Sequence, residues 1–158
     1  MQMENDADDF GYSYADYEEN PDPDHRPMYL RRTLDFLNEL PAGAAVLDAG
    51  CGGGLFSVGI KEAGYAVYGI DMSRSGINAA EKREIGRFKV ASVFQDIARP
   101  FDRQDFDAII AIEVIEHLYS PARFAEMIHQ ALKPGGIVVI STPYWGYLKN
   151  IVLAVTNR

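Results

Sequence analysis

The sequence predicts an α/β fold, a doubly wound parallel sheet of five strands with helices on both faces. Short apolar runs of about five residues alternate with helix-like segments of about ten, which is the pattern of strand–helix–strand units. Acidic residues follow most of these runs, and a glycine cluster follows the first one. The chain has 158 residues, close to the length of one ordinary domain.

Composition indicates a soluble globular protein, with 47% hydrophobic and 24% charged residues. The longest apolar runs, such as 109–112 and 137–140, are far shorter than the ~20 residues that span a bilayer. No basic-then-apolar leader opens the chain, so we expect no secretory signal. Cys51 is the only cysteine, which fits a reducing compartment. These features predict a cytoplasmic protein.

The negative charge is concentrated at the N-terminus. Lys and Arg number 15 against 23 Asp and Glu, a net charge of −8. Residues 1–24 hold nine of the acids and no Lys or Arg, so the rest of the chain is nearly neutral. Neither part has the clustered basic residues of a nucleic-acid binder. We therefore expect an acidic, aromatic and partly flexible segment over 1–27, followed by one domain over 28–158.

Helix and strand signals alternate through the first half of that domain. Leucines recur at helical spacing before Pro41, and Gly64 stands in the position that ends a later helix. Ser73 or Ser75 can cap a polar helix that Gly86 terminates. The sequence thus predicts a helix over 28–40, a strand over 44–47, a helix over 55–63, a strand over 65–70 and a helix from Ser73 or Ser75 to about residue 84.

The second half continues the alternation. Ser120 and Pro121 are typical of a helix start, with the cap first and proline in the first turn. The residues Lys133-Pro-Gly-Gly136 are typical of a tight turn. We expect strands over 88–94, 106–112 and 137–141, a helix from Pro121 to Leu132, and a final apolar-faced helix over 144–155.

Four acids are expected at one edge of the predicted sheet. Asp48, Asp71, Asp96 and Glu113 stand at or just beyond the ends of the first four strands. Because the carboxyl ends of parallel strands meet at one edge, these side chains should lie together. Ligands bind at this edge in such folds.

The glycine cluster Gly50-Cys-Gly-Gly-Gly54 suggests a nucleotide but argues against a phosphate. A dinucleotide fingerprint needs glycine or alanine where Leu55 stands, and a phosphate-binding loop needs Gly-Lys-Ser/Thr. Asp48 would also repel an anion at the N-terminus of the next helix. A ligand with a cationic amine fits better. A nicotinamide-dinucleotide-binding domain is the less favoured alternative.

The spacing of the acids describes that ligand further. Asp71 ends the second strand, 23 residues after Asp48, where an acid can accept both hydroxyls of a ribose. Asp96 could accept the exocyclic amine of an adenine. An adenosine with an amino-acid tail is S-adenosylmethionine. Taken singly, each of these acids could instead be a helix cap or part of a turn.

Four motifs occur together and in order. They are Val46-Leu-Asp-Ala-Gly-Cys-Gly-Gly-Gly54, Gly69-Ile-Asp-Met72, Phe106-Asp-Ala-Ile-Ile-Ala-Ile-Glu-Val-Ile-Glu-His117 and Leu132-Lys-Pro-Gly-Gly136. Over about residues 28–145 the chain resembles class I S-adenosylmethionine-dependent methyltransferases. Within them it is most similar to the branch that includes the 3-O-methyltransferase of ubiquinone biosynthesis.

The resemblance implies a Rossmann-like sheet with strand order 3-2-1-4-5. Strands six and seven close that family's sheet as a hairpin, for which no residues remain here. We therefore expect a C-terminally incomplete domain. Its strand-five edge and final helix should favour self-association.

The resemblance also implies the roles of the site residues. In the resembled branch an arginine on the helix before the first strand contacts the methionine carboxylate. Arg31 is the best match to that position, and Arg32 is the second candidate. Asp48, Gly50 and Gly52 are expected to contact the methionine half of the cofactor, and Asp71 the ribose. Met72, Asp96 and Ile97 are expected to contact the adenine. Ile112 and Glu113, at the end of the fourth strand, are also expected to contact the cofactor. Core packing is an equal alternative for Met72.

The cluster Glu113-Val-Ile-Glu116-His117 is the candidate catalytic segment. Methyl transfer is a direct displacement, so the nucleophile, the methyl group and the sulfur must be aligned. An oxygen nucleophile also loses a proton, which His117, next to Glu116, could accept. Some members of the resembled branch use such a cluster for a divalent metal, but Mg²⁺ prefers oxygen ligands, and we assign no metal. Glu116 and His117 could instead simply open the loop before Ser120.

We therefore expect an enzyme that transfers a methyl group from S-adenosylmethionine to a small-molecule acceptor, at oxygen, and releases S-adenosylhomocysteine. The alternative is a module that binds either compound without catalysis.

Overall fold

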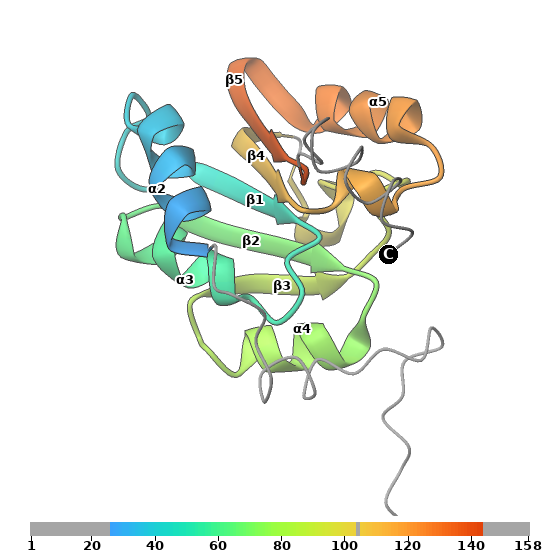
Figure 1. Cartoon of the computed structure of the whole chain (residues 1–158), viewed down its shortest axis with the longest axis horizontal. Coiled ribbons are helices and arrows are strands. Elements are labelled where there is room, and N and C mark those ends of the chain that lie inside the picture. Colours follow the sequence, from blue (N-terminus) through green and yellow to red (C-terminus); the bar gives the residue numbers. More distant parts are fainter. Residues whose placement is uncertain (1–25, 104, 144–158) are drawn as a thin grey trace, which may run out of the picture.

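The computed structural model describes residues 26–103 and 105–143, and these form a five-stranded parallel sheet in the order β3-β2-β1-β4-β5 (Figure 1). The predicted fold class and strand order are confirmed. The predicted segment up to residue 25 and the predicted helix over 144–155 lie outside the described residues. The elements are α2 (Arg26–Leu37), β1 (Ala45–Ala49), α3 (Leu55–Glu62), β2 (Ala66–Asp71), α4 (Arg74–Glu81), β3 (Gly86–Val90), the 3₁₀ turn η1 (Arg99–Phe101), β4 (Phe106–Ile112), the 3₁₀ turn η2 (Ile115–His117), α5 (Pro121–Ala131) and β5 (Leu132–Ser141).

The sheet is buried on both faces because its strands carry apolar residues at successive positions. All five residues of β1 are buried. Val46 packs with residues of α2, α3 and α4 on one face, whereas Leu47 and Ala49 pack with α5 and η1 on the other. Successive strand side chains point to opposite faces, so Asp48 lies on the same face as Val46. That face carries the helix that follows the glycine cluster.

Helix α2 lies unusually close to α3 because a glycine faces it. A Cβ built on Gly59 would lie only 2.1 Å from Cδ2 of Leu30. The Tyr65 hydroxyl donates a hydrogen bond to the carbonyl of Leu37, the last residue of α2, at 2.7 Å. The predicted helix ended at Leu40, but only a turn follows Leu37, closed by the N–H of Leu40. These contacts fix the rotation of α2 about its axis.

The prediction for the third strand was wrong at both of its ends. β3 begins at Gly86, where we expected a helix to stop, because α4 already ends at Glu81 and Glu84 turns the chain with a φ of 53°. It ends at Val90, which pairs with Asp71, the last residue of β2. Beyond that point no β2 residue remains to pair with. Asp96 therefore lies in a loop well past the strand.

The fifth strand also begins earlier than predicted. β5 starts at Leu132, paired with Phe106, and the next pair is Ala108 with Ile137. The residues 133–136, predicted as a tight turn, form a bulge within the strand, with Gly135 at a φ of 79°. From this bulge Lys133 pairs with Asp107 at 2.6 Å. The bulge therefore replaces the turn and adds an ion pair at the start of β4.

Among the described residues of β5, two apolar side chains are exposed to solvent. Val138 is 40% exposed and Ile140 is 41% exposed. Self-association through this strand stays a prediction. None of the helices in the described ranges is long and apolar enough to cross a membrane.

Candidate functional site

The glycine loop between β1 and α3 is held against the end of β2. The N–H groups of Gly50 and Cys51 both donate to the carbonyl of Ile70, at 2.8 and 3.0 Å. Gly50 has a φ of 87°, and a Cβ there would lie 2.6 Å from Cγ2 of Val114, so this position needs glycine. The loop therefore follows a fixed path beneath the segment that succeeds β4.

Asp71 connects this loop to the next helix. Its Oδ2 accepts the N–H of Gly52 at 2.9 Å, and its Oδ1 accepts the N–H of Ser73 at 2.8 Å. Ser73 in turn caps α4 by accepting the N–H of Gly76 at 3.0 Å. The acid at the end of β2 thus orders both neighbouring segments, and the structure brings together Gly50, Gly52 and Asp71 as the sequence predicted.

Arg83 holds the opposite side of the glycine loop. Its Nε donates to the carbonyl of Gly53 at 2.8 Å, from the turn that follows α4. Arg83 was not predicted from the sequence. The two positions are 30 residues apart, and no local pattern connects them. Arg83 and Asp71 therefore fix consecutive residues of the loop.

Asp48 is buried beneath the loop and is hydrogen-bonded to Ser57 of α3. The Ser57 hydroxyl donates to Oδ2 of Asp48 at 2.6 Å, and both residues are buried. Burial raises the pKa of Asp48 to about 7; the hydrogen bond from Ser57 opposes this rise, and the nearby Asp71 carboxylate adds to it. Asp48 can therefore change its charge near neutral pH. Ser57 was not predicted from the sequence.

Cys51 is a buried free thiol in the glycine loop. Burial raises its pKa well above the ordinary value, and the carboxylates of Asp48 and Asp71 raise it further. The thiolate is the reactive form of cysteine. Cys51 therefore serves as a small side chain within the glycine loop.

Glu113 is fixed at the carboxyl end of β4 by Ser141 of β5. The N–H of Glu113 donates to Oγ of Ser141 at 3.0 Å, and this hydroxyl donates to Oε1 of Glu113 at 2.7 Å. Glu113 has a φ of 56°, an uncommon conformation for a residue other than glycine. The preceding residue, Ile112, pairs with Ser141 in the sheet. The two strand ends thus hold the Glu113 carboxylate in place.

Tyr29 joins this acidic end of the sheet from α2. Burial raises the pKa of its phenol, and the charges of Glu113 and Glu116 raise it further. Tyr29 was not predicted from the sequence, because its position depends on how Leu30 of α2 packs against Gly59 of α3. The Tyr29 phenol therefore lies near enough to feel the negative charges of both carboxylates.

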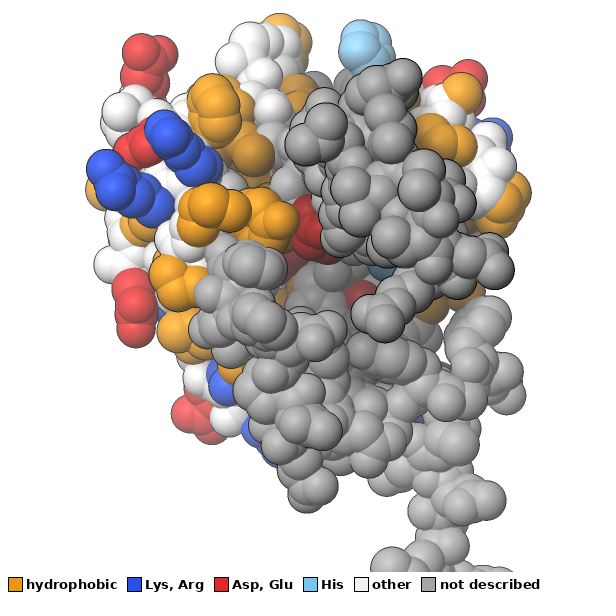
Figure 2. Space-filling view, viewed as in Figure 1, with side chains coloured by type: hydrophobic (Ala, Val, Ile, Leu, Met, Phe, Trp, Pro, Cys, Tyr) orange, Lys and Arg blue, Asp and Glu red, His pale blue; other side chains and the backbone are white. Residues whose placement is uncertain are grey.

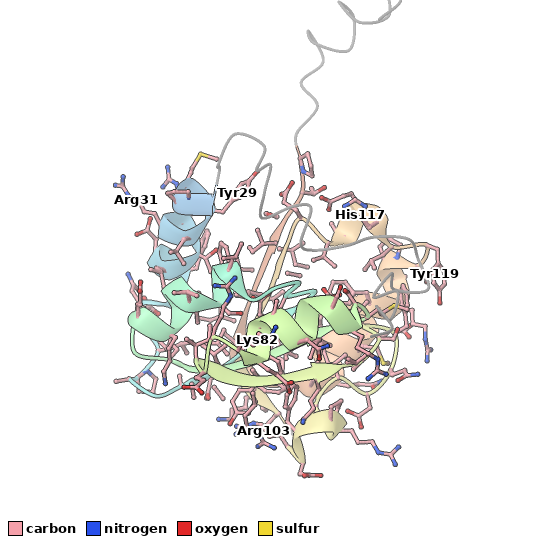
Figure 3. The ribbon with its side chains drawn as sticks, turned by 90° about the horizontal axis from the view of Figure 1, so that it is seen from below. Tyr29, Arg31, Lys82, Arg103, His117 and Tyr119 are labelled. Carbon is pink, nitrogen blue, oxygen red and sulfur yellow. The ribbon has the colours of Figure 1, made fainter. Side chains whose placement is uncertain are left out.

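Arg31, by contrast, lies on the outer side of α2. In Figure 3, Arg31 and Tyr29 point to different sides of this helix, and Arg31 points away from the sheet. Arg32 is exposed and lies 3.9 Å from Asp35. The structure does not bring either arginine to the glycine loop, so their contact with a cofactor stays a prediction.

The three residues predicted to contact adenine differ in their exposure and in their hydrogen bonds. Oδ1 of Asp96 accepts the N–H groups of Ala98 and Arg99, at 3.2 and 3.1 Å, so this acid already serves as the turn residue that the alternative interpretation expected. Ile97 is fully buried in the core, whereas Met72 is 50% exposed beside Asp71. Met72 and Asp96 are therefore accessible to a ligand whereas Ile97 is not, and all three assignments stay predictions.

His117 and Glu116 lie exposed on the short turn η2. Figure 3 shows His117 and Tyr119 on the α5 side of the molecule. The Tyr119 ring lies 4.4 Å from that of Phe94, which follows β3. Within the described ranges, no group of three or more His, Cys, Asp or Glu side chains could hold a metal ion.

The donor set at this edge fits S-adenosylmethionine better than a phosphate. The groups gathered are the carboxylates of Asp48 and Asp71, backbone amides and the Ser57 hydroxyl. In Figure 2, acidic side chains lie in a hollow of the visible face, next to a patch of hydrophobic side chains. Carboxylates accept from ribose hydroxyls and attract amines, but they repel phosphates.

Comparison with known proteins gives consistent similarities. A family model described as "Methyltransferase domain" matches residues 24–151. The ubiquinone biosynthesis O-methyltransferase of Coxiella burnetii is 38% identical over 115 residues, which cover 70% of this chain and 49% of that protein. That of Alkalilimnicola ehrlichii is 33% identical over 123 residues, covering 75% and 49%. The chain thus spans about half the length of these curated relatives.

Solved structures share the fold at lower identity. The magnesium protoporphyrin IX methyltransferase of Synechocystis PCC 6803 with bound S-adenosylhomocysteine superposes with a TM-score of 0.67 and 18% identity. The match covers 84% of this chain and 62% of that one. At this identity the similarity shows the fold alone.

Proposed function

The chain belongs to the methyltransferase domain family, in the class I group that uses S-adenosylmethionine, and from this premise we propose that it transfers a methyl group to an oxygen of a small-molecule acceptor. The observation that carries the proposal is the bond between Asp71 and Gly52. It joins the acid expected at the ribose to the loop expected at the methionine half, so one ligand would contact both.

The residues that would hold the cofactor lie at the carboxyl ends of β1 and β2. Gly50, Gly52 and Asp48 would surround the methionine half, and Asp71 would accept the ribose hydroxyls. Met72 is exposed next to Asp71 and would cover one side of the adenine. S-adenosylmethionine supplies an electrophilic methyl group on a sulfonium and leaves as S-adenosylhomocysteine.

The protein's own contribution to such a reaction is alignment. The bonds of Gly50, Gly52 and Gly53 to Ile70, Asp71 and Arg83 fix the loop before any ligand arrives. A preformed site has less ordering entropy to lose when a ligand binds. The hydrogen bonds from the N–H groups of Gly50 and Gly52 to β2 thus hold the loop in place at the edge of the sheet where the cofactor would bind.

We assign the proton acceptor to His117, with Glu116 beside it. An acceptor hydroxyl loses its proton when it is methylated, and histidine is the side chain best suited to accept a proton near neutral pH. Both residues are exposed on η2, directly after the β4 end. This position leaves the imidazole accessible to an acceptor.

Oxygen as the methylated atom is supported by the relatives, whose names identify them as O-methyltransferases. A small molecule rather than a nucleic acid is supported by the charge pattern, since the chain carries a net charge of −8. We also propose that the protein is cytoplasmic, because a free cysteine such as Cys51 is compatible with a reducing compartment.

A methyl-transfer assay with a panel of acceptors tests the proposal. The chain is incubated with methyl-labelled S-adenosylmethionine and catechols, simple phenols, carboxylic acids and amines. We expect label in the ether products of the phenolic acceptors. Labelled amines alone would contradict oxygen transfer. Cofactor binding without any labelled product would instead favour a binding module.

A further inference from the structure

We propose that Ser57 is a positioning residue for the cofactor site, because its hydroxyl donates to the buried Asp48 carboxylate beneath the glycine loop and so favours the ionised form of Asp48. The inference deepens the proposed function and rests on it. Ser57 lies on α3 and Asp48 on β1, and their side chains meet at 2.6 Å with both residues buried.

The fold itself does not require a carboxylate at this position. The residues on either side of Asp48, Leu47 and Ala49, are fully buried and apolar, and so is Val46 on the same face as Asp48. Burying a charge in such surroundings costs stability unless it is paired. A buried carboxyl with one hydroxyl partner among the described residues is therefore better explained by a role in ligand binding than by packing.

The other described groups around Asp48 do not favour its ionised form, so its charge depends on the Ser57 hydroxyl. Asp71, at the end of β2, is a like charge and disfavours the ionised form. From β4 the residue paired with Asp48 is Ile110, which carries no charge. Cys51 in the loop stays a neutral thiol. Among the described residues that act on this carboxyl, Ser57 is the one that favours its charge.

The charge of Asp48 matters for the ligand. The methionine half of S-adenosylmethionine and of S-adenosylhomocysteine carries a cationic amine near neutral pH. Asp48 lies beneath the loop expected to contact that half, where water is scarce and charges interact strongly. Ionised Asp48 attracts the amine, whereas protonated Asp48 does not. Ser57 thus acts on the ligand through Asp48, without contacting it.

Calorimetric titration with S-adenosylhomocysteine between pH 5.5 and 8.5 tests this inference on the wild-type chain, Ser57→Ala and Ser120→Ala. Ser120 precedes α5, and its side chain caps no backbone group. Comparing each variant with wild type at the same pH cancels titration of the ligand. A hydrogen bond to a charged group corresponds to about one pH unit or more in a titration midpoint.

We expect Ser57→Ala to bind about fivefold more weakly than wild type at pH 7 if its midpoint rises by about one unit. The deficit should shrink toward pH 8.5. Ser57→Cys, with a weaker donor of similar size, should lie between the two, and Ser120→Ala should follow wild type. A deficit of the same size at every pH would mean that Ser57 is merely structural, and it would overturn the inference.

A second measurement separates this inference from the proposed function. Carbon NMR of ligand-free protein labelled at the aspartate carboxyls follows the ionisation of Asp48 directly. We expect its midpoint to rise in the order wild type, Ser57→Cys, Ser57→Ala. An unchanged midpoint overturns the role of Ser57. If wild type binds no S-adenosylhomocysteine at any pH, the proposed function fails, yet the NMR midpoints still decide whether Ser57 favours the charged form of Asp48.

Discussion

Oδ2 of Asp71 accepts the backbone N–H of Gly52 at 2.9 Å, so the acid that ends β2 holds the loop that follows β1. The two residues are 19 positions apart in the sequence. One carboxylate thereby shapes the loop expected at the methionine half and stands where the ribose is expected. Changes at Asp71 should affect both halves of the ligand.

Substitution of Asp71 should reduce cofactor affinity strongly. Asp71→Ala removes an acceptor of charge-assisted hydrogen bonds, each worth ~1.5–3 kcal/mol, so we expect the affinity for S-adenosylhomocysteine to fall on the order of tenfold to a thousandfold. Asp71→Asn, which keeps one acceptor oxygen, should lose less. Calorimetric titration measures both. Asp102→Asn, an exposed acid after η1, is the control and should bind normally. Normal binding by Asp71→Ala would refute the ribose assignment.

The catalytic assignment predicts a separation of turnover from binding. His117→Ala should lower turnover by about 10²–10⁴-fold, because proton transfer is lost, while the affinity for S-adenosylhomocysteine is kept. Release of S-adenosylhomocysteine with a phenolic acceptor measures turnover. His129→Ala, an exposed histidine on α5, is the matched control and should retain full turnover. If His117→Ala loses affinity and turnover together, the histidine has a structural role.

Asp107 should stabilise the fold at neutral pH and not in acid. Burial alone would raise its pKa, but the bonds from Lys133 and from the N–H of Ala45, at 2.6 and 2.8 Å, bring the pKa below its ordinary value. A carboxyl whose pKa is lower in the folded protein stabilises the fold at pH values above its pKa in the unfolded chain, about 3.9. This stabilisation is lost as the pH falls through the pKa of the folded protein.

We therefore expect Asp107→Asn to lower the free energy of unfolding by about 1 kcal/mol at pH 7, after allowance for solvent screening. The difference from wild type should disappear at low pH. Urea unfolding between pH 2.5 and 7 measures it. Asp35→Asn, in the exposed pair with Arg32, should change stability by under about 0.5 kcal/mol. A pH-independent loss in Asp107→Asn would show that its charge is not responsible.

The close approach of α2 and α3 predicts that a single methyl group cannot be added between them. Gly59→Ala should destabilise the protein by about 1–3 kcal/mol, because the Leu30 side chain at 2.1 Å must move, although alanine itself favours a helix. Adding Leu30→Ala should restore part of the loss. Urea unfolding of the single and double variants measures this coupling. Strictly additive losses would mean that the two residues do not interfere.

The strands and the two central acids could be predicted from the sequence because their signals are local. Apolar runs define the strands, and a carboxylate at the end of a run must lie at the edge of the sheet, which brought Asp48 and Asp71 to the glycine loop. Asp96 was misplaced for the same reason. Val93 and Phe94 extend an apolar run, but they pack outside β3, because β2 has already ended.

The supporting residues could not be predicted because they act across long distances in the sequence. Ser141 and Glu113 are 28 residues apart, and Arg83 and Gly53 are 30 apart. Ser57 needed the packing of α3 on β1. Whether Tyr29 or Arg31 turned toward the site depended on the rotation of α2, which Gly59 and Leu30 determine. None of these contacts has a local pattern.

Calorimetric titration of the wild-type chain at pH 8 with S-adenosylhomocysteine and, separately, with a nicotinamide dinucleotide tests directly which cofactor this edge of the sheet binds. The account predicts saturable binding of one S-adenosylhomocysteine per chain and no heat from the dinucleotide, because the edge that holds Asp48 and Asp71 favours a cationic amine and repels phosphates. Saturable binding of the dinucleotide with none of S-adenosylhomocysteine would contradict it.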